Sequence, residues 1–191
     1  YGDLVVKADG SYTYTPTGKG GGKEIFVYEI ISPTGESDKS TIEINVGKDV
    51  IGSRKADIVE SGSAHDVYSL GLGSDTVIFD VLDRKDAVGG NGLDSWTDFY
   101  VGDTAIELNA DKIDISALLS DQNISNHIDL AQYVSVEVKD GNTVLSIDRD
   151  GKNFDDQDQL IQDQFEGTQL LILENNTVSL DELLKNNQII Y

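Results

Sequence analysis

The sequence predicts a mostly β protein, and three patterns along the chain lead to this fold class. Short runs near the start alternate apolar and polar residues between turn residues, which is typical of half-buried strands. The middle of the chain is rich in Gly and Asp and has no helical periodicity. Two runs near the end, residues 134–138 and 144–147, flank the turn pair Asp140-Gly141, which predicts a hairpin. These patterns divide the chain into three segments: residues 1–47, 48–115 and 116–191.

The first segment is predicted to hold four strands that form part of a β-sandwich. The strand-like runs are residues 1–7, 11–15, 24–31 and 40–46. Alternation places Tyr12 and Tyr14 on one face of the second run. Short alternating strands joined by Gly- and Pro-containing turns are typical of β-sandwiches.

The third segment is predicted to add a further strand and a short helix to the hairpin. Residues 168–173 form an apolar run of strand length. Ser179 and Glu182 have the spacing of a capping box. The apolar residues of the predicted helix are Leu180, Leu183 and Leu184.

Composition narrows the classes of function. The 191 residues carry a formal net charge of −21, which argues against nucleic acid as a partner because its phosphates would repel the chain. Divalent cations would relieve the self-repulsion, although so many acidic residues also favour solubility.

Cys is absent, so we expect neither disulfides nor thiolate sites. No apolar run suits a transmembrane segment or a signal peptide. Because Met is also absent, we expect the chain to be cut from a longer polypeptide.

Aspartates recur with a period of nine residues in the second segment. Asp57, Asp66 and Asp75 are nine residues apart, and Asp94 belongs to a fourth block after an insertion. A larger apolar residue stands two places after each of them: Val59, Tyr68, Val77 and Trp96. The fourth block, Gly89-Gly-Asn-Gly-Leu-Asp-Ser-Trp-Thr, fits the calcium-binding nonapeptide G-G-x-G-x-D-x-U-x, in which U is large and apolar. The third block lacks one Gly, and the first two lack more.

The nonapeptide suits calcium for physical reasons. Gly permits a tight turn that exposes backbone carbonyls, and Asp adds the hard carboxylate oxygen that calcium prefers. Successive blocks make opposite turns of a parallel β-roll, so turns two blocks apart stack with a calcium ion between them. We expect Asp75 and Asp94 as ligands, and Asp57 and Asp66 as weaker ones because their blocks lack glycines. Backbone oxygens are expected near Gly71, Gly73, Gly90 and Gly92. The alternative is an acidic, glycine-rich surface loop, which the nine-residue period disfavours.

These repeats resemble those of the repeats-in-toxin (RTX) family. The stretches Trp96-Thr-Asp-Phe and Asp111-Lys-Ile-Asp-Ile-Ser resemble the sequences that close RTX rolls. The resemblance implies that Asp98, Asp111 and Asp114 complete the terminal calcium sites. Ordinary turn formation is an equal alternative for these three residues.

A second acidic stretch begins at Asp148. Asp148, Asp150 and Gly151 match the start of an EF-hand calcium loop. The twelfth position of this loop would be Gln159 instead of the required Glu, so an EF-hand is rejected. A looser calcium loop and a solvated acidic hairpin end remain as alternatives.

The first segment resembles the second half of the immunoglobulin-like or cadherin-like repeats of large bacterial surface adhesins. The matching stretches are YGDLVVKADGSYTYTP, FVYEI and STIEINV. The first strands of such a repeat are missing, so either the chain is truncated or another element supplies them. The resemblance therefore implies a partial Ig-like sandwich, then a calcium-bound β-roll, then a β-rich secretion domain with short helices.

This order of segments resembles the carboxy-terminal region of an RTX adhesin exported by type I secretion. The resemblance implies that the type I secretion transporter reads an uncleaved signal in the tail. It also implies that the chain folds on calcium outside the bacterial cell or on its surface. The alternative is the RTX tail of a secreted hydrolase or pore-forming toxin, because those proteins also carry the nonapeptides.

No catalytic constellation is recognisable in the sequence, and we expect no enzyme. His65 and His127 are the two histidines, which is little material for a His-based metal site. No nucleophile elbow, P-loop or dinucleotide fingerprint occurs. A separate ligand-binding module is disfavoured because the tail has no aromatic platform.

Overall fold

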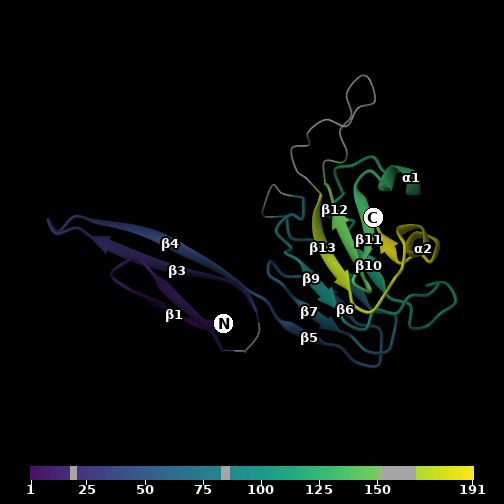
Figure 1. The fold of residues 1–191 in the computed structure, drawn as a ribbon, viewed down its shortest axis with the longest axis horizontal. Helices are drawn as coiled ribbons and strands as arrows, with labels where there is room; N and C mark the ends of the chain where they lie inside the picture. Colours follow the sequence, from purple (N-terminus) through teal and green to yellow (C-terminus); the bar gives the residue numbers. More distant parts are fainter. Residues whose placement is uncertain (18–20, 83–86, 150, 152–166) are drawn as a thin grey trace, which may run out of the picture.

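The computed structural model describes residues 1–17, 21–82, 87–149, 151 and 167–191. Within these residues the protein is mostly β, as predicted, with two short helices. Figure 1 shows an elongated extension, here called the arm (residues 1–46), beside a rounder unit, here called the body (residues 49–191).

The arm consists of two antiparallel hairpins. Strand β1 (Gly2–Val6) pairs with β2 (Tyr12–Pro16), and β3 (Gly22–Ile31) pairs with β4 (Ser37–Val46) along ten residue pairs. The hairpins contact each other through Tyr14, whose ring lies edge-on to Phe26 with centroids 6.2 Å apart. The Tyr14 hydroxyl also donates a hydrogen bond of 2.7 Å to Glu24. Four strands are therefore present where the sequence predicts them.

The first six strands of the body alternate between two sheets. Their bounds are β5 (Asp49–Ile51), β6 (Ile58–Glu60), β7 (Val67–Ser69), β8 (Thr76–Ile78), β9 (Asp94–Trp96) and β10 (Lys112–Asp114). Strands β5, β7 and β9 pair in parallel in one sheet, and β6, β8 and β10 pair in parallel in the other. The chain thus crosses from one sheet to the other at each turn, and strands two steps apart become neighbours.

The register aligns the apolar positions of the repeats. Tyr68 pairs with Trp96 in the first sheet, and Val77 pairs with Ile113 in the second. All four side chains are completely buried. Trp96 also lies edge-on to Phe99, with ring centroids 5.0 Å apart. Side chains that alternate along strands as short as three residues therefore form a column of large apolar groups between the sheets.

The last segment extends both sheets. Strand β13 (Thr168–Leu173) pairs in parallel with β9, and β14 (Ile189–Ile190) pairs in parallel with β10. Strands β11 (Val134–Lys139) and β12 (Asn142–Ile147) continue the first sheet in antiparallel order. Their hairpin turns at Asp140-Gly141, where both residues have positive φ, so the predicted hairpin is confirmed.

Helices α1 (His127–Leu130) and α2 (Leu180–Lys185) are short. The predicted N-cap of α2 is confirmed, because the Ser179 hydroxyl accepts a hydrogen bond of 3.2 Å from the Glu182 amide. Leu183 and Leu184 of α2 are buried in the same core as Trp96. One hydrophobic core therefore serves both the repeats and the tail. Neither helix, nor any other among the described residues, is long and apolar enough to cross a membrane.

Candidate metal centre

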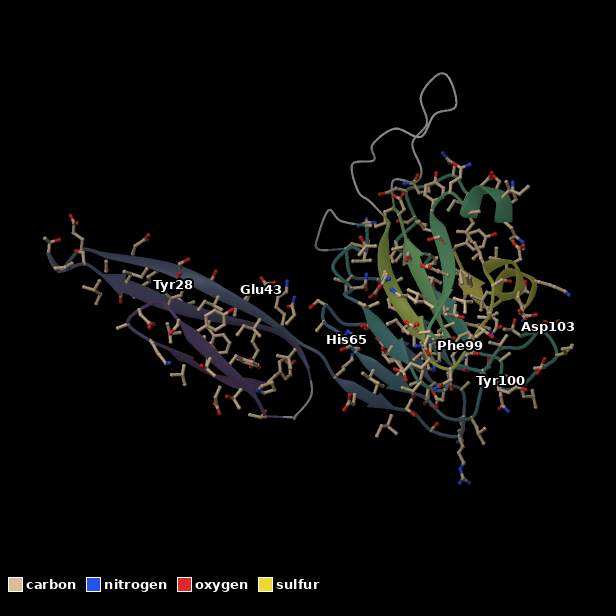
Figure 2. All side chains as sticks on the ribbon, in the orientation of Figure 1. Tyr28, Glu43, His65, Phe99, Tyr100 and Asp103 are labelled. Carbon is tan, nitrogen blue, oxygen red and sulfur yellow. The ribbon has the colours of Figure 1, made fainter. Side chains whose placement is uncertain are left out.

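The turns that precede the parallel strands lie in two columns. The first turn stack comprises residues 52–57, 71–75 and 109–111, which lead into β6, β8 and β10. The second turn stack comprises residues 47–48, 61–66 and 89–94, and the last two of these turns lead into β7 and β9. Figure 2 shows His65 of the second turn stack where the body meets the arm.

Glycine is required in these turns because neighbouring turns approach closely. Gly71 and Gly73 have φ values of 95° and 127°, which side-chain-bearing residues rarely adopt. A Cβ atom on Gly71 would collide with the carbonyl oxygen of Ser53. A Cβ atom on Gly73 would lie 2.7 Å from the carbonyl oxygen of Lys55. The glycines therefore let carbonyl oxygens of one turn face the next turn.

The second turn stack is built in the same way. Gly90 and Gly92 have φ values of 96° and 86°. A Cβ atom on Gly92 would lie 2.7 Å from the carbonyl oxygen of Ala64. The four glycines expected beside backbone ligands thus all lie in stacked turns with positive φ, as the nonapeptide requires.

Aspartate side chains connect the turns of the first stack. The amide of Asp57 donates a hydrogen bond of 2.8 Å to Asp75 Oδ1, and the amide of Asp75 donates one of 2.9 Å to Asp111 Oδ1. Each carboxylate thus caps the backbone of the aspartate in the preceding turn. The recurring aspartates therefore link successive turns through hydrogen bonds from side chain to backbone.

The second stack repeats this arrangement. The amide of Lys48 donates a hydrogen bond of 2.9 Å to Asp66 Oδ1, and the amide of Asp66 donates one of 2.8 Å to Asp94 Oδ1. The other oxygen of Asp66 accepts a hydrogen bond from the Gly62 amide and lies 3.9 Å from Lys48 Nζ. Asp66 therefore also holds the segment that connects the arm to the body.

Asp75 differs from the other repeat aspartates in its second oxygen. Its side chain is completely buried, and Oδ2 has no hydrogen-bond partner in the structure. Burial also raises the pKa of Asp75 above its ordinary value, with nearby Asp57 and Asp98 adding to the increase. A buried carboxylate oxygen without a partner costs free energy, so this atom is suited to a cation that the carbonyls of the same turns help to hold.

Asp94 uses both oxygens in the structure. Its Oδ2 accepts hydrogen bonds of 2.8 Å from the Ser61 hydroxyl and from the Tyr68 hydroxyl, which occupy the two lone pairs of that atom. Burial raises the pKa of Asp94 to about 7. Its geometry therefore gives Asp94 a structural role in holding the apolar column, and leaves Oδ1 as the oxygen that could reach an ion.

Asp111 belongs to the first turn stack, and Asp98 forms hydrogen bonds to it from the segment after β9. Asp111 Oδ2 accepts a hydrogen bond of 2.7 Å from the Tyr100 amide, and burial raises the Asp111 pKa to about 7. Asp98 accepts hydrogen bonds from the amides of Leu70 and Gly71 at 3.0 and 2.8 Å. Both carboxylates thus stabilise the turns beside Asp75. Figure 2 shows Tyr100 beside Phe99 at this edge of the body.

The remaining candidates lie apart from this arrangement. Asp114 accepts hydrogen bonds from the amide and hydroxyl of Ser116 at 3.0 and 2.6 Å, which is the geometry of ordinary turn formation. Asp148 accepts a hydrogen bond of 3.0 Å from the Gly151 amide in a separate loop, and Asp150 lies outside the described residues. Asp57 accepts from the Ser53 amide within its own turn.

Two further residues, Asn109 and Gln188, stabilise the first turn stack, and the sequence patterns did not single them out. Asn109 Oδ1 accepts a hydrogen bond of 3.1 Å from the Gly73 amide. The Gln188 side chain is completely buried and donates to the carbonyls of Tyr100 and Asp111 at 2.9 Å. The nine-residue period gives a signal for Asn109. Asp111 follows Asp75 by 36 residues, a multiple of nine, and Asn109 stands two places before Asp111. No local pattern identifies Gln188.

Within the ranges that the structure describes, no three acidic or His side chains lie close enough together to hold an ion. An ion between stacked turns would take several of its oxygens from backbone carbonyls, as calcium permits. In each turn stack the repeat aspartates lie in different turns. An ion between two turns would therefore meet few carboxylates and several backbone carbonyls, which is this mode of binding.

Comparison with known proteins gives no assignment for this arrangement. No family model matches the chain, and no curated protein sequence matches it.

Proposed function

We propose that residues 48–115 form a calcium-bound parallel β-roll of the RTX type. Asp75 carries the proposal, because its buried and unpartnered oxygen lies in a column of turns in which carbonyl oxygens of one turn face glycines of the next. The parallel pairing of β6 with β8, at a spacing of 18 residues, supports it further. Calcium accepts carbonyl and carboxylate oxygens in flexible geometry, which suits turns of unequal length.

Calcium would supply the charge that the buried carboxylates need. Without a cation, desolvation favours protonated Asp94 and Asp111 and opposes folding near neutral pH. A bound cation favours the ionised carboxylates and thereby converts binding energy into folding energy. Extracellular calcium modules bind at roughly 10⁻⁴ to 10⁻³ M, so the chain would stay loose in a cytosol that is low in calcium.

We further propose that the chain is the carboxy-terminal region of a secreted or surface-bound bacterial adhesin and has no catalytic role. The arm is interpreted as part of an Ig-like or cadherin-like repeat, since its four strands precede the turn stacks. The rival assignment to the tail of a secreted hydrolase or pore-forming toxin shares the β-roll but places a catalytic domain before it. The β-strands of the arm, which stand where a hydrolase or toxin would place its catalytic domain, favour assignment to an adhesin.

The tail is proposed to have two roles at different times. In the folded body, Leu183, Leu184 and Ile189 are buried. In the unfolded chain before export, the same residues would be free for a type I transporter to read. Deletion of residues 179–191 should abolish secretion of a fused passenger into the medium, and deletion of residues 1–47 should not. Undiminished secretion after the first deletion would remove this part of the proposal.

The metal assignment is tested by calcium titration calorimetry on residues 1–191 and two single variants. Asp75→Asn should weaken calcium binding by about tenfold or more, because it removes carboxylate charge at the ion. Asp181→Asn is the matched control, since Asp181 is an exposed residue of α2. Equal affinities for the two variants would contradict the assignment of Asp75.

A further inference from the structure

The long hairpin of the arm leaves both of its edges without a partner strand among the described residues, and exposed apolar side chains lie along β3. Strands β3 and β4 form a sheet of two strands. Phe26 contacts the short hairpin, so Ile25 and Val27 lie on the opposite face of β3, where they are 61% and 67% exposed. Exposed, long, apolar edge strands readily pair with another strand. The edge of β3 is separate from the turn stacks.

The outer face of β3 has a self-complementary order of residues. Alternate positions along it are Lys23, Ile25, Val27 and Glu29. If two copies of β3 pair in antiparallel order about Phe26, Lys23 lies opposite Glu29 of the second copy, and Ile25 lies opposite Val27. Each contact then occurs twice, as a twofold interface requires. Opposite charges and apolar pairs facing each other across strands are favourable.

The neighbouring strand β4 offers no such row. Its outer face carries Lys39, Thr41 and Glu43, which are exposed and polar. Glu43 already forms an ion pair with Lys23 at 3.2 Å within the hairpin. That pair holds the Lys23 side chain over the outer face, beside the apolar residues of β3.

The charge distribution also favours pairing through the arm. Residues 1–47 hold seven acidic and four basic residues, a net charge of −3, whereas the remaining chain carries −18 of the total of −21. Figure 1 shows the body at the end of the arm where β3 begins and β4 finishes. Antiparallel pairing would place the two bodies at opposite ends of a strand about 33 Å long, beyond the range of strong charge repulsion at physiological salt.

From this complementarity we infer that the arm is a docking surface for a second copy of the same chain. Two β3 strands pair in antiparallel order about Phe26 and create a four-stranded sheet. The dimer does not depend on the turn stacks or on calcium, so its test is independent of the proposed metal site.

Charge-reversal variants test this inference by sedimentation equilibrium, in chelator and in calcium. Glu29→Lys places lysine opposite Lys23, and Lys23→Glu places glutamate opposite Glu29, so each should weaken dimerisation by about tenfold or more. An equimolar mixture of the two variants should form a heterodimer with nearly the original affinity. The double variant should recover the homodimer, because both opposite-charge pairs are restored.

Glu36→Lys is the matched control, since it makes the same charge change in the exposed turn between β3 and β4. It should leave dimerisation unchanged, and circular dichroism should confirm that every variant folds. A monomer at all soluble concentrations would overturn the inference. An association that is equally sensitive to Glu36→Lys and Glu29→Lys, or that the double variant fails to restore, would overturn it as well.

Discussion

The arm and the body differ in where their large apolar side chains lie, although both consist of β-strands. In the body, Trp96 and Tyr68 are completely buried, on strands of only three residues. In the arm, Val27 is 67% exposed on a strand of ten residues. Strand length therefore does not determine burial in this protein. Stacking of repeated turns gives the body an interior, whereas a pair of hairpins cannot enclose one.

The two regions also differ in how they use acidic residues. In the body, buried carboxylates cap amides of neighbouring turns, as Asp94 does for Asp66. In the arm, Glu24 receives hydrogen bonds at a hairpin contact and the other acidic residues are exposed. We therefore expect the body to respond strongly to cations and pH, and the arm to respond weakly.

The largest contrast is expected from truncation of apolar side chains. Trp96→Ala should lower the free energy of unfolding of the body by about 3–5 kcal/mol, because it leaves a cavity against Tyr68 and Phe99. At protein concentrations at which the chain is monomeric, Val27→Ala in the arm should change it by less than about 0.5 kcal/mol. Urea denaturation followed by far-UV circular dichroism measures both values. Similar losses for the two variants would mean that the exposed face of the arm is covered in solution.

A pH dependence of the calcium-free body is the next largest effect. The pKa values of Asp94 and Asp111 are about 7 in the folded state and about 4 in the unfolded chain. Between these values the unfolded chain releases protons that the folded body retains, so stability is highest below about pH 4 and falls as the pH rises to about 7. We expect a loss on the order of a few kcal/mol.

Thermal melts in chelator at pH 4 to 7.5 measure this dependence, and Asp94→Asn should reduce it. Asp181→Asn, which changes an exposed carboxylate, should leave the pH dependence unchanged. Stability that rises over this pH range would contradict the raised pKa values as its main cause.

The smallest effect is expected at the hairpin contact of the arm. Tyr14→Phe removes the hydroxyl that donates to Glu24 but keeps the ring against Phe26. Loss of this hydrogen bond should lower the stability of the arm only slightly, because water can replace the partner of an exposed group. The Glu24 hydrogen bond also helps raise the Tyr14 pKa to about 12, after burial as the larger cause. Spectroscopic titration should therefore show that the tyrosine missing from the variant is one with a raised pKa. Loss of a group that titrates near the ordinary tyrosine pKa of about 10 would count against this contact.

Local patterns predicted much of the fold. The residue two places after each repeat aspartate lies in a strand in all four blocks, and Tyr68, Val77 and Trp96 are buried there. The hairpin around Asp140-Gly141 and the Ser179 cap were also predictable, because turn and cap preferences act over a few residues. The parallel pairing of β13 with β9 was not, because it joins residues more than 70 positions apart.

The sequence predicted which residue types form the candidate site, but not which carboxylate oxygens have hydrogen-bond partners. The nine-residue period placed Asp75 and Asp94 in equivalent positions. Only the packing distinguishes them, because Tyr68 and Ser61 reach Asp94 while Asp75 Oδ2 is left without a partner. Gln188 reaches Asp111 across 77 residues, which no local spacing can encode.

Hydrogen exchange with mass spectrometry, in chelator and in millimolar calcium, compares the two regions most directly. We expect calcium to protect the amides of residues 48–115 by about tenfold or more, with those of Asp57 and Asp75 in the first turn stack among them. Amides of β3 and β4 should exchange at the same rate in both conditions. Magnesium in place of calcium should protect the amides of the body poorly, because it demands octahedral geometry and retains its waters. Exchange of residues 48–115 that is identical with and without calcium would contradict the account.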